Sequence, residues 1–119
     1  HPNSRRQRQM CIRDRSNHEA IAAAKSGIEG FARSAAATYA KDNLRVNVIA
    51  PSIMDSNMSE KILSSEAARE VSKNMHPISK IGDADDILPV IKWLLSPDAK
   101  WVTGQTIHVD GGLSTVKPR

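Results

Sequence analysis

Aromatic residues are scarce in this 119-residue chain, at 3% of the sequence, so its core must be built from aliphatic side chains. Cysteine is nearly absent too: Cys11 has no partner for an intrachain disulfide, which argues against a disulfide-stapled fold and fits a reducing cytoplasm. No apolar run approaches the roughly 18 residues of a membrane span. The six glycines never form the G-x-G-x-x-G phosphate-binding pattern. These absences predict a small aliphatic domain with no membrane partner.

Positive charge is in excess in only one place. Residues 1–16 contain five arginines and a single acid, Asp14, and so account for the whole net charge of +4. A basic segment can bind nucleic acid by neutralising phosphates, but this one has no aromatic residue to stack on bases and no folded reader behind it. We therefore expect no nucleic-acid partner.

The first fifteen residues show no structural pattern. They have no apolar period and no hydrophobic stretch of the kind found in a secretory signal. The text RQRQMCIRDR resembles translated sequencing-adapter sequence. We expect residues 1–15 to be a disordered or non-native leader and residues 16–119 to be part of one domain.

The segment from Ser16 to Asn43 has the features of one long helix. Ser16 and Glu19 have the spacing of a capping box, in which each side chain satisfies a backbone N–H at the helix start. Asn43 suits the left-handed residue that follows a helix. Between these ends apolar residues recur every three or four positions, which predicts one buried face. This predicted face consists of Ile21, Ala24, Ile28, Phe31, Ala32, Ala35 and Tyr39.

A short strand is predicted directly after this helix. Residues 45–50 are rich in β-branched side chains, and Pro51 ends the run because it cannot donate a ladder hydrogen bond. A long helix that leads into a short apolar strand is the second half of a βαβ crossover. Ligands bind at the carboxyl ends of such strands, so residues 51–58 are a candidate binding loop.

Two further helices and a strand are predicted in the rest of the chain. Residues 59–74 have helical spacing, with Ser56 or Ser59 as possible caps, and the sequence His76-Pro77 ends that helix. The apolar positions of this helix are Ile62, Leu63, Ala67, Val71 and Met75. Asp83 opens the next helix, with Ile87, Val90, Ile91, Leu94 and Leu95 as its buried stripe. Residues 105–110 alternate as a strand with Ile107 and Val109 on one face. The predicted fold class is α/β, with the two strands parallel neighbours.

Separated stretches of this text resemble the short-chain dehydrogenase/reductase family. AAAKSGIEGFARSAAATYAKDNLRVNVIAPSIMDSNM is similar to the family's segment from the active-site lysine, through RVN-x-(V/I)-(A/S)-P-G, to the loop over the nicotinamide. TGQTIHVDGG at residues 103–112 resembles the family's last strand and its trailing Asp-Gly-Gly. The resemblance implies that residues 16–119 are the carboxyl-terminal half of a Rossmann-like, doubly wound parallel sheet that binds NAD or NADP.

The resemblance also implies one catalytic residue and the absence of a second one close to it. Lys25 matches the lysine that binds the nicotinamide-ribose hydroxyls and lowers the pKa of a tyrosine one helical turn earlier. That tyrosine position is held here by Ile21, which cannot transfer a proton. His18 is the one candidate replacement, about 10 Å before Lys25 along the helix axis on nearly the same face. A histidine in a capping turn is more often a surface residue, and both interpretations stay open.

The implied cofactor contacts lie in the loop after the first strand, at Pro51, Ser52, Met54 and Ser56. By resemblance, the Met54 backbone faces the nicotinamide carboxamide and the Ser56 hydroxyl replaces a threonine at the pyrophosphate. Ser52 stands where glycine is usual, and its Cβ is expected to narrow the cofactor's approach and to restrict positive φ. No residue pattern predicts a metal site.

Two functions follow from the resemblance. In the first, the intact protein is an NAD(P)-dependent oxidoreductase that acts on a small carbonyl or alcohol substrate as a cytoplasmic dimer or tetramer. In the second, it is a non-catalytic relative that keeps the fold and the oligomer contacts. Lys25 and Ser56 favour the enzyme, and Ile21 favours the binding module. We expect the 119-residue chain alone to be inactive, because it lacks the phosphate loop, the catalytic serine and the tyrosine.

Overall fold

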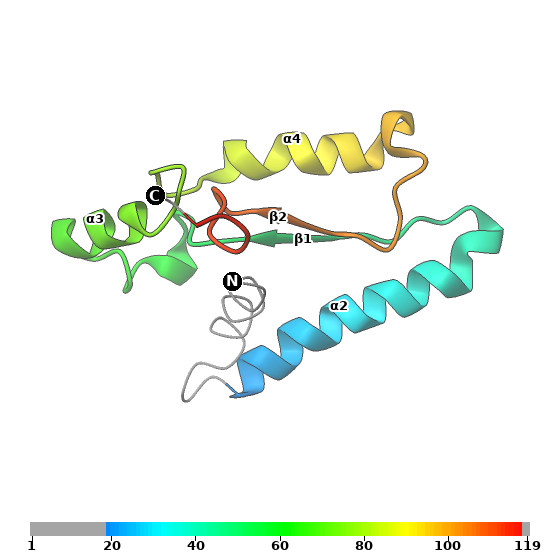
Figure 1. The fold of residues 1–119 in the computed structure, drawn as a ribbon, viewed down its shortest axis with the longest axis horizontal. Helices are drawn as coiled ribbons and strands as arrows, with labels where there is room; N and C mark the ends of the chain where they lie inside the picture. Colours follow the sequence, from blue (N-terminus) through cyan, green and yellow to red (C-terminus); the bar gives the residue numbers. More distant parts are fainter. Residues whose placement is uncertain (1–18, 118–119) are drawn as a thin grey trace.

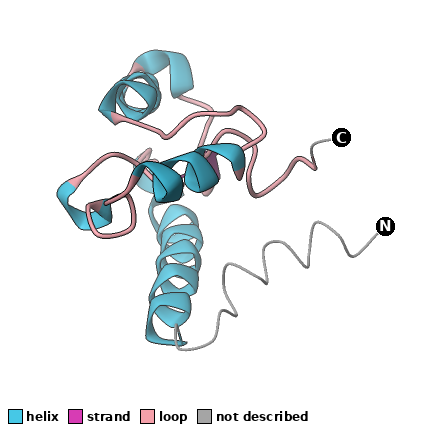
Figure 2. Ribbon diagram, turned by 90° about the vertical axis from the view of Figure 1, so that its left-hand side faces the viewer, coloured by secondary structure: helices cyan, strands magenta, loops and turns pink. Residues whose placement is uncertain are grey.

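Two parallel strands with helices on both sides form the centre of the described chain, residues 19–117 of a computed structural model (Figure 1). In order, the main elements are α2 (Glu19–Tyr39), β1 (Val48–Pro51), α3 (Glu66–Asn74), α4 (Ala84–Leu95) and β2 (Thr106–Val109). Short 3-10 helices occur at Ala40–Asp42, Asn57–Ser59 and Pro97–Ala99. Figure 2 shows the same arrangement from the side, with α2 and α4 on opposite sides of the strands. The predicted α/β architecture is confirmed.

β1 and β2 pair in parallel, as predicted. Val48 lies opposite Thr106, and the register continues to Pro51 opposite Val109. Both strands are shorter than the predicted ranges of 45–50 and 105–110. Pro51 is the last residue of β1 and not the first residue after it.

α2 packs on the sheet through alanines. Ala32 and Ala36 are buried, and an added Cβ on Gly104 would lie 3.6 Å from the Ala36 Cβ, so the helix comes close to the start of β2. The large apolar residues predicted to be buried are instead exposed, namely Ile21, Ile28, Phe31 and Tyr39. The period correctly predicts the helix, but small side chains form its inner face because they allow the closest approach.

Only one of the two predicted ends of α2 can be compared with the structure. Its predicted start at Ser16 lies outside the described residues. At the other end the chain passes through the 3-10 helix Ala40–Asp42 to Asn43, whose φ of 58° is left-handed, as the sequence predicts.

The predicted helix over residues 59–74 is wrong in its first half. Only α3 is helical, and its cap is Ser65, whose side chain accepts a hydrogen bond from the Ala68 N–H. Ser56 and Ser59 cap the 3-10 helix Asn57–Ser59 instead, which ends helical structure there. The predicted stripe is also wrong in part, because Leu63 is buried while Ile62, Val71 and Met75 are exposed.

α4 begins where its acidic residues predict. The Asp83 carboxylate accepts from the Asp85 N–H at 2.9 Å, and the Asp86 carboxylate accepts from the Asp83 N–H at 2.9 Å, so each carboxylate satisfies an orphan donor. Leu94 is buried against the sheet as expected, but Leu95 is 79% exposed and does not belong to the buried stripe.

A polar clamp made of Arg45 and Asn47 joins the start of β1 to the segment that precedes β2. The Arg45 guanidinium donates to the Leu94 carbonyl at 2.6 Å and to the Val102 carbonyl at 3.3 Å. The Asn47 amide donates to the same Val102 carbonyl at 3.0 Å and accepts from the Gln105 N–H at 3.1 Å. The Asn47 side chain therefore takes the place of a backbone rung just before the ladder begins.

We expect Asn47→Ala to reduce the free energy of unfolding by about 1–2 kcal/mol, because the Gln105 N–H loses its acceptor and the clamp loses two hydrogen bonds. Urea unfolding followed by circular dichroism measures this change. The matched control is Asn74→Ala, which also removes two side-chain hydrogen bonds, one to Glu70 at 3.4 Å and one from the Ser79 hydroxyl at 3.3 Å, but at an exposed position. Equal stability of the two variants would contradict a structural role for the clamp.

Candidate functional site

The candidate site lies at the carboxyl ends of β1 and β2, where a cavity of about 200 Å³ is formed. The loop after β1, the segment between α3 and α4, and the residues that follow β2 line it. Its walls are largely apolar, and its polar side chains are those of Ser52, His76, Lys80, Asp86 and Asp110. A cavity at this edge of a parallel sheet agrees with the predicted position of a ligand site.

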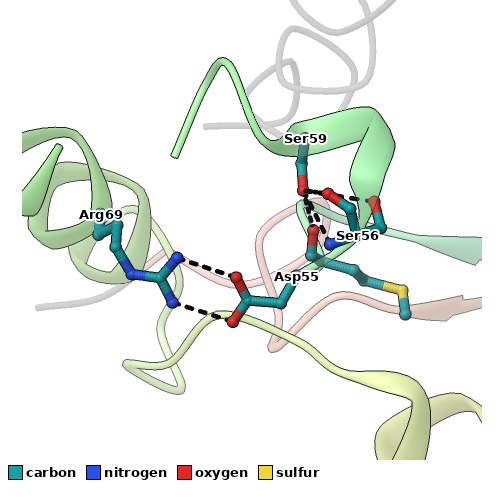
Figure 3. Close-up of polar contacts among 5 residues, drawn as sticks. Asp55, Ser56, Ser59 and Arg69 are labelled. Atoms are coloured by element: carbon teal, nitrogen blue, oxygen red, sulfur yellow. Dashed lines mark hydrogen bonds and ion pairs between the residues drawn. The ribbon is translucent and has the colours of Figure 1, made fainter. Parts of the chain in front are cut away.

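The loop after β1, residues 52–59, is held in shape by its own serines (Figure 3). The buried Ser59 hydroxyl donates to the Met54 carbonyl and lies 3.3 Å from the Ser56 hydroxyl, and it accepts from the Ser56 N–H at 3.1 Å. Gly82 adds a second support, because its N–H donates to the Ile53 carbonyl at 3.2 Å. Ser56 itself is exposed and is not among the residues that line the cavity.

An ion pair connects this loop to α3. Figure 3 shows the Arg69 guanidinium facing the Asp55 carboxylate, with both hydrogen bonds 2.9 Å long. The hydrogen bonds from Arg69 lower the pKa of the Asp55 carboxyl below its usual value, and the pair raises the pKa of Arg69. This contact is not predicted by the sequence, because no pattern marks residues 14 positions apart as partners across a loop.

Ser52 points its hydroxyl at a buried histidine. The Ser52 Oγ lies 2.9 Å from His76 Nε2, and His76 Nδ1 lies 2.7 Å from the Ser72 carbonyl. Among the described non-glycine residues only Asn43 has positive φ, so Ser52 carries none of the expected backbone restriction. The sequence identified His76 only as the residue that ends a helix, and its role in the site comes from the fold.

The far wall of the cavity carries two acids and a cation. Lys80 Nζ lies 2.8 Å from the Asp86 carboxylate, and this hydrogen bond lowers the pKa of Asp86 and raises that of Lys80. Burial raises the pKa of Asp110, but hydrogen bonds from Ser114 and from the Gly112 N–H outweigh burial and leave that pKa below its usual value. Asp110 is thus a structural anion that fixes the turn after β2.

The predicted site residues are only partly brought together. Ser52, Met54 and Ser56 lie in one loop, and Pro51 is the last residue of the strand that leads into it. Lys25 is exposed in the second turn of α2, and the start of that helix lies at the same end of the molecule as the carboxyl end of β1 (Figure 1). No hydrogen bond or ion pair among the described residues joins Lys25 to the loop. His18 lies outside the described residues, so its predicted role is not tested.

The described residues contain neither a candidate metal site nor a candidate membrane-spanning helix. They contain no group of three or more histidine, cysteine, aspartate or glutamate side chains placed to hold a metal ion. Within residues 19–117, no helix combines the length and the apolar character that crossing a bilayer requires.

Comparisons with known proteins agree on one family. The profile of a family described as enoyl-(acyl carrier protein) reductase matches residues 10–114. A 3-oxoacyl-[acyl-carrier-protein] reductase of Haemophilus influenzae is 40% identical over 91 residues, which are 76% of this chain and 37% of the relative. A tropinone reductase homologue of Arabidopsis thaliana is 35% identical over 92 residues, which are 77% of this chain and 34% of the relative.

Solved structures give the same result. A 4-hydroxyisoleucine dehydrogenase complexed with NADH matches with a TM-score of 0.78 and 29% identity, over 83% of this chain and 41% of that one. A 3-oxoacyl-[acyl-carrier protein] reductase from Brucella melitensis matches with a TM-score of 0.72 and 32% identity, over 80% and 35% of the two chains. This chain therefore spans little more than a third of the length of these relatives.

We expect Arg69→Gln to speed amide exchange in α3 roughly twofold to fivefold at pH 6, because it removes the ion pair that holds α3 to the loop. Asp55 has a lowered pKa in the folded state, so its contribution is complete above the unfolded value of 3.8 and is lost as the pH falls through the lower folded value. The difference between variant and wild type should therefore vanish in acid. Hydrogen exchange followed by NMR measures the α3 exchange rates. The variant and the wild type are compared at the same pH, first at pH 6 and then in acid.

The control for this experiment is Lys73→Gln, which removes an exposed cation from the same helix without touching Asp55. If both variants exchange alike at pH 6, or if the effect of Arg69→Gln persists in acid, the ion pair does not hold α3.

Proposed function

This chain belongs to the short-chain dehydrogenase/reductase family, and from that premise we propose that it forms the carboxyl-terminal part of an NAD(P)-dependent oxidoreductase. The reaction class is hydride transfer between the nicotinamide and a small carbonyl or alcohol substrate. NAD(P) supplies the hydride chemistry when bound, and the chain supplies one side of its binding site. The relatives named above are reductases and dehydrogenases, which supports this class.

The observation that carries the proposal is the serine-braced loop at the carboxyl end of β1. Residues 51–56 are fixed by the Ser59 hydroxyl, by Gly82 and by the Asp55–Arg69 ion pair, so their backbone is preorganised for a ligand. The lack of positive φ at Ser52 means that the loop adopts this shape without glycine. This geometry fits a nicotinamide that approaches the backbone between Pro51 and Met54.

Each proposed contact has a distinct role. Lys25 would bind the nicotinamide-ribose hydroxyls, and the exposed Ser56 hydroxyl would donate to the pyrophosphate. The Met54 carbonyl already accepts from Ser59, so the carboxamide contact would fall mainly on the remaining backbone groups of the loop.

Ile21 supports a second candidate, a non-catalytic binding or oligomerisation module. It stands one turn before Lys25, where the family places its proton-transferring tyrosine, and its side chain has no titratable group. The other candidate acid or base is His18, which would have to reach the substrate from the turn before. The two candidates differ in one measurable property, which is turnover.

We further propose that the intact protein is a cytoplasmic homo-oligomer, a dimer or a tetramer. The unpaired Cys11 fits a reducing compartment. The oligomer is supported by α2, on which the large apolar side chains of Ile21, Ile28, Phe31 and Tyr39 remain exposed.

A chimera tests the enzyme hypothesis. Residues 19–114 would replace the matching part of the Thermotoga maritima 3-oxoacyl-[acyl-carrier-protein] reductase, which is 38% identical over 92 residues. We expect the chimera to bind NADP(H) but to turn over at least 100-fold more slowly than the parent, because Ile21 cannot transfer a proton. Ile21→Tyr should restore most of that loss. The 119-residue chain alone should show no steady NAD(P)H oxidation.

The matched control is Ile28→Tyr, which adds the same phenol to the same exposed face two turns later. Recovery by Ile21→Tyr alone supports an oxidoreductase site. A chimera that binds no cofactor, or that recovers equally with either tyrosine, would refute the proposed function.

Oligomerisation is tested on the 119-residue chain itself. We expect it to self-associate or to be partly molten, because a chain this small exposes apolar surface on α2 and has little stability to spare. Phe31→Glu should lower the weight-average mass in light scattering, since the Phe31 side chain is 74% exposed on that face. Leu44→Glu, an exposed site outside the helix, is the control. A monodisperse wild-type monomer with a cooperative thermal transition would contradict this prediction.

A further inference from the structure

Ser52 and His76 have the geometry of a nucleophile and its base. The hydroxyl oxygen lies 2.9 Å from His76 Nε2, within the range for a proton transfer. On the other side of the ring, Nδ1 lies 2.7 Å from the Ser72 carbonyl, which can only accept. Nδ1 of the neutral ring therefore carries the proton, and Nε2 presents a lone pair to the Ser52 hydroxyl.

The surroundings hold this pair in place. His76 is only 4% exposed, so its ring cannot turn freely, and the helix end at Ser72 fixes the tautomer. The pair links two segments far apart in sequence, the loop after β1 and the residue that follows α3. The other serine–serine and serine–aspartate contacts of the site, at Ser59 and Ser114, involve no imidazole.

The pair also faces space for a ligand. Ser52 and His76 both line the cavity of about 200 Å³, whose walls are mostly apolar. Lys80 is the only lysine or arginine among the lining residues, but its Nζ is paired with the Asp86 carboxylate at 2.8 Å, and Asp110 also lines the cavity. A short, uncharged acyl group therefore suits this space.

From this arrangement we propose that Ser52 is a reactive serine that accepts a short acyl group from an activated ester, with His76 as its general base. The Ser52 O–H bond breaks and its proton passes to His76 Nε2, while Oγ forms a bond to the acyl carbon. The ester bond then breaks, and the leaving phenoxide or alkoxide takes the proton from the imidazolium. The product is an acylated Ser52 and a free phenol or alcohol.

The Ser72 carbonyl, which orients His76, limits the rate at which Ser52 can be acylated. A backbone carbonyl fixes the correct tautomer, but it stabilises the imidazolium less than a carboxylate does. The structure therefore favours a single acylation by an activated ester over rapid turnover. This reaction needs neither cofactor nor the rest of a dehydrogenase, so it is independent of the proposed function.

Acetylation by 4-nitrophenyl acetate tests the proposal on the 119-residue chain. We expect release of one equivalent of nitrophenol per chain, with the acetyl group mapped to Ser52 by peptide mass spectrometry. Ser52→Ala should abolish this event, and His76→Gln should slow it about 100-fold. Ser64→Ala, which removes an exposed serine outside the cavity, should leave the rate unchanged.

A second measurement covers the case in which a His76 variant fails to fold. The wild-type chain is labelled in buffer and in urea, and folding should raise the acetylation rate of Ser52 at least about tenfold above that of the unfolded chain. Equal rates in the two conditions would refute the proposal. So would acetylation spread evenly over the serines, or labelling of Ser52 that is unchanged in a folded His76→Gln variant.

Discussion

The polar clamp of Arg45 and Asn47 is the constraint on which the rest of the structure depends. Two strands of four residues each bury little area, and a two-stranded sheet alone is marginal. The clamp supplies four side-chain hydrogen bonds just before the ladder starts, and Arg45 also joins the end of α4 to it. It fixes the register, and the register decides which residues meet at the carboxyl edge.

At that edge the loop after β1 is connected to the flanking segments by polar contacts. Asp55 pairs with Arg69 on α3, Ser52 bonds to His76 just after α3, and Gly82 pairs with the backbone at Ile53. These contacts hold the loop, α3 and the segment before α4 as one unit.

α2 buries small side chains and leaves large ones exposed. Ala32 and Ala36 are buried, while Ile28 and Phe31 are exposed. Ile28 precedes Ala32 by four residues, and residues four apart lie on the same side of a helix, so the buried stripe ends between them. Exposed apolar area of this size is typical of a surface that packs against further structure.

The sequence by itself determined α2, α4, the parallel strands, the left-handed Asn43 and the position of the loop, because these depend on local period, capping and turn chemistry. It also placed Ser52, Met54 and Ser56 in one loop directly after Pro51. Only the tertiary structure decided which face of α2 is buried, that α3 begins at Glu66, and that Ser52 meets His76 and Asp55 meets Arg69. The last two contacts join residues 24 and 14 positions apart and are fixed by packing, so they leave no periodic signal in the chain. The buried face of α2 likewise depends on a segment far along the chain, near Gly104.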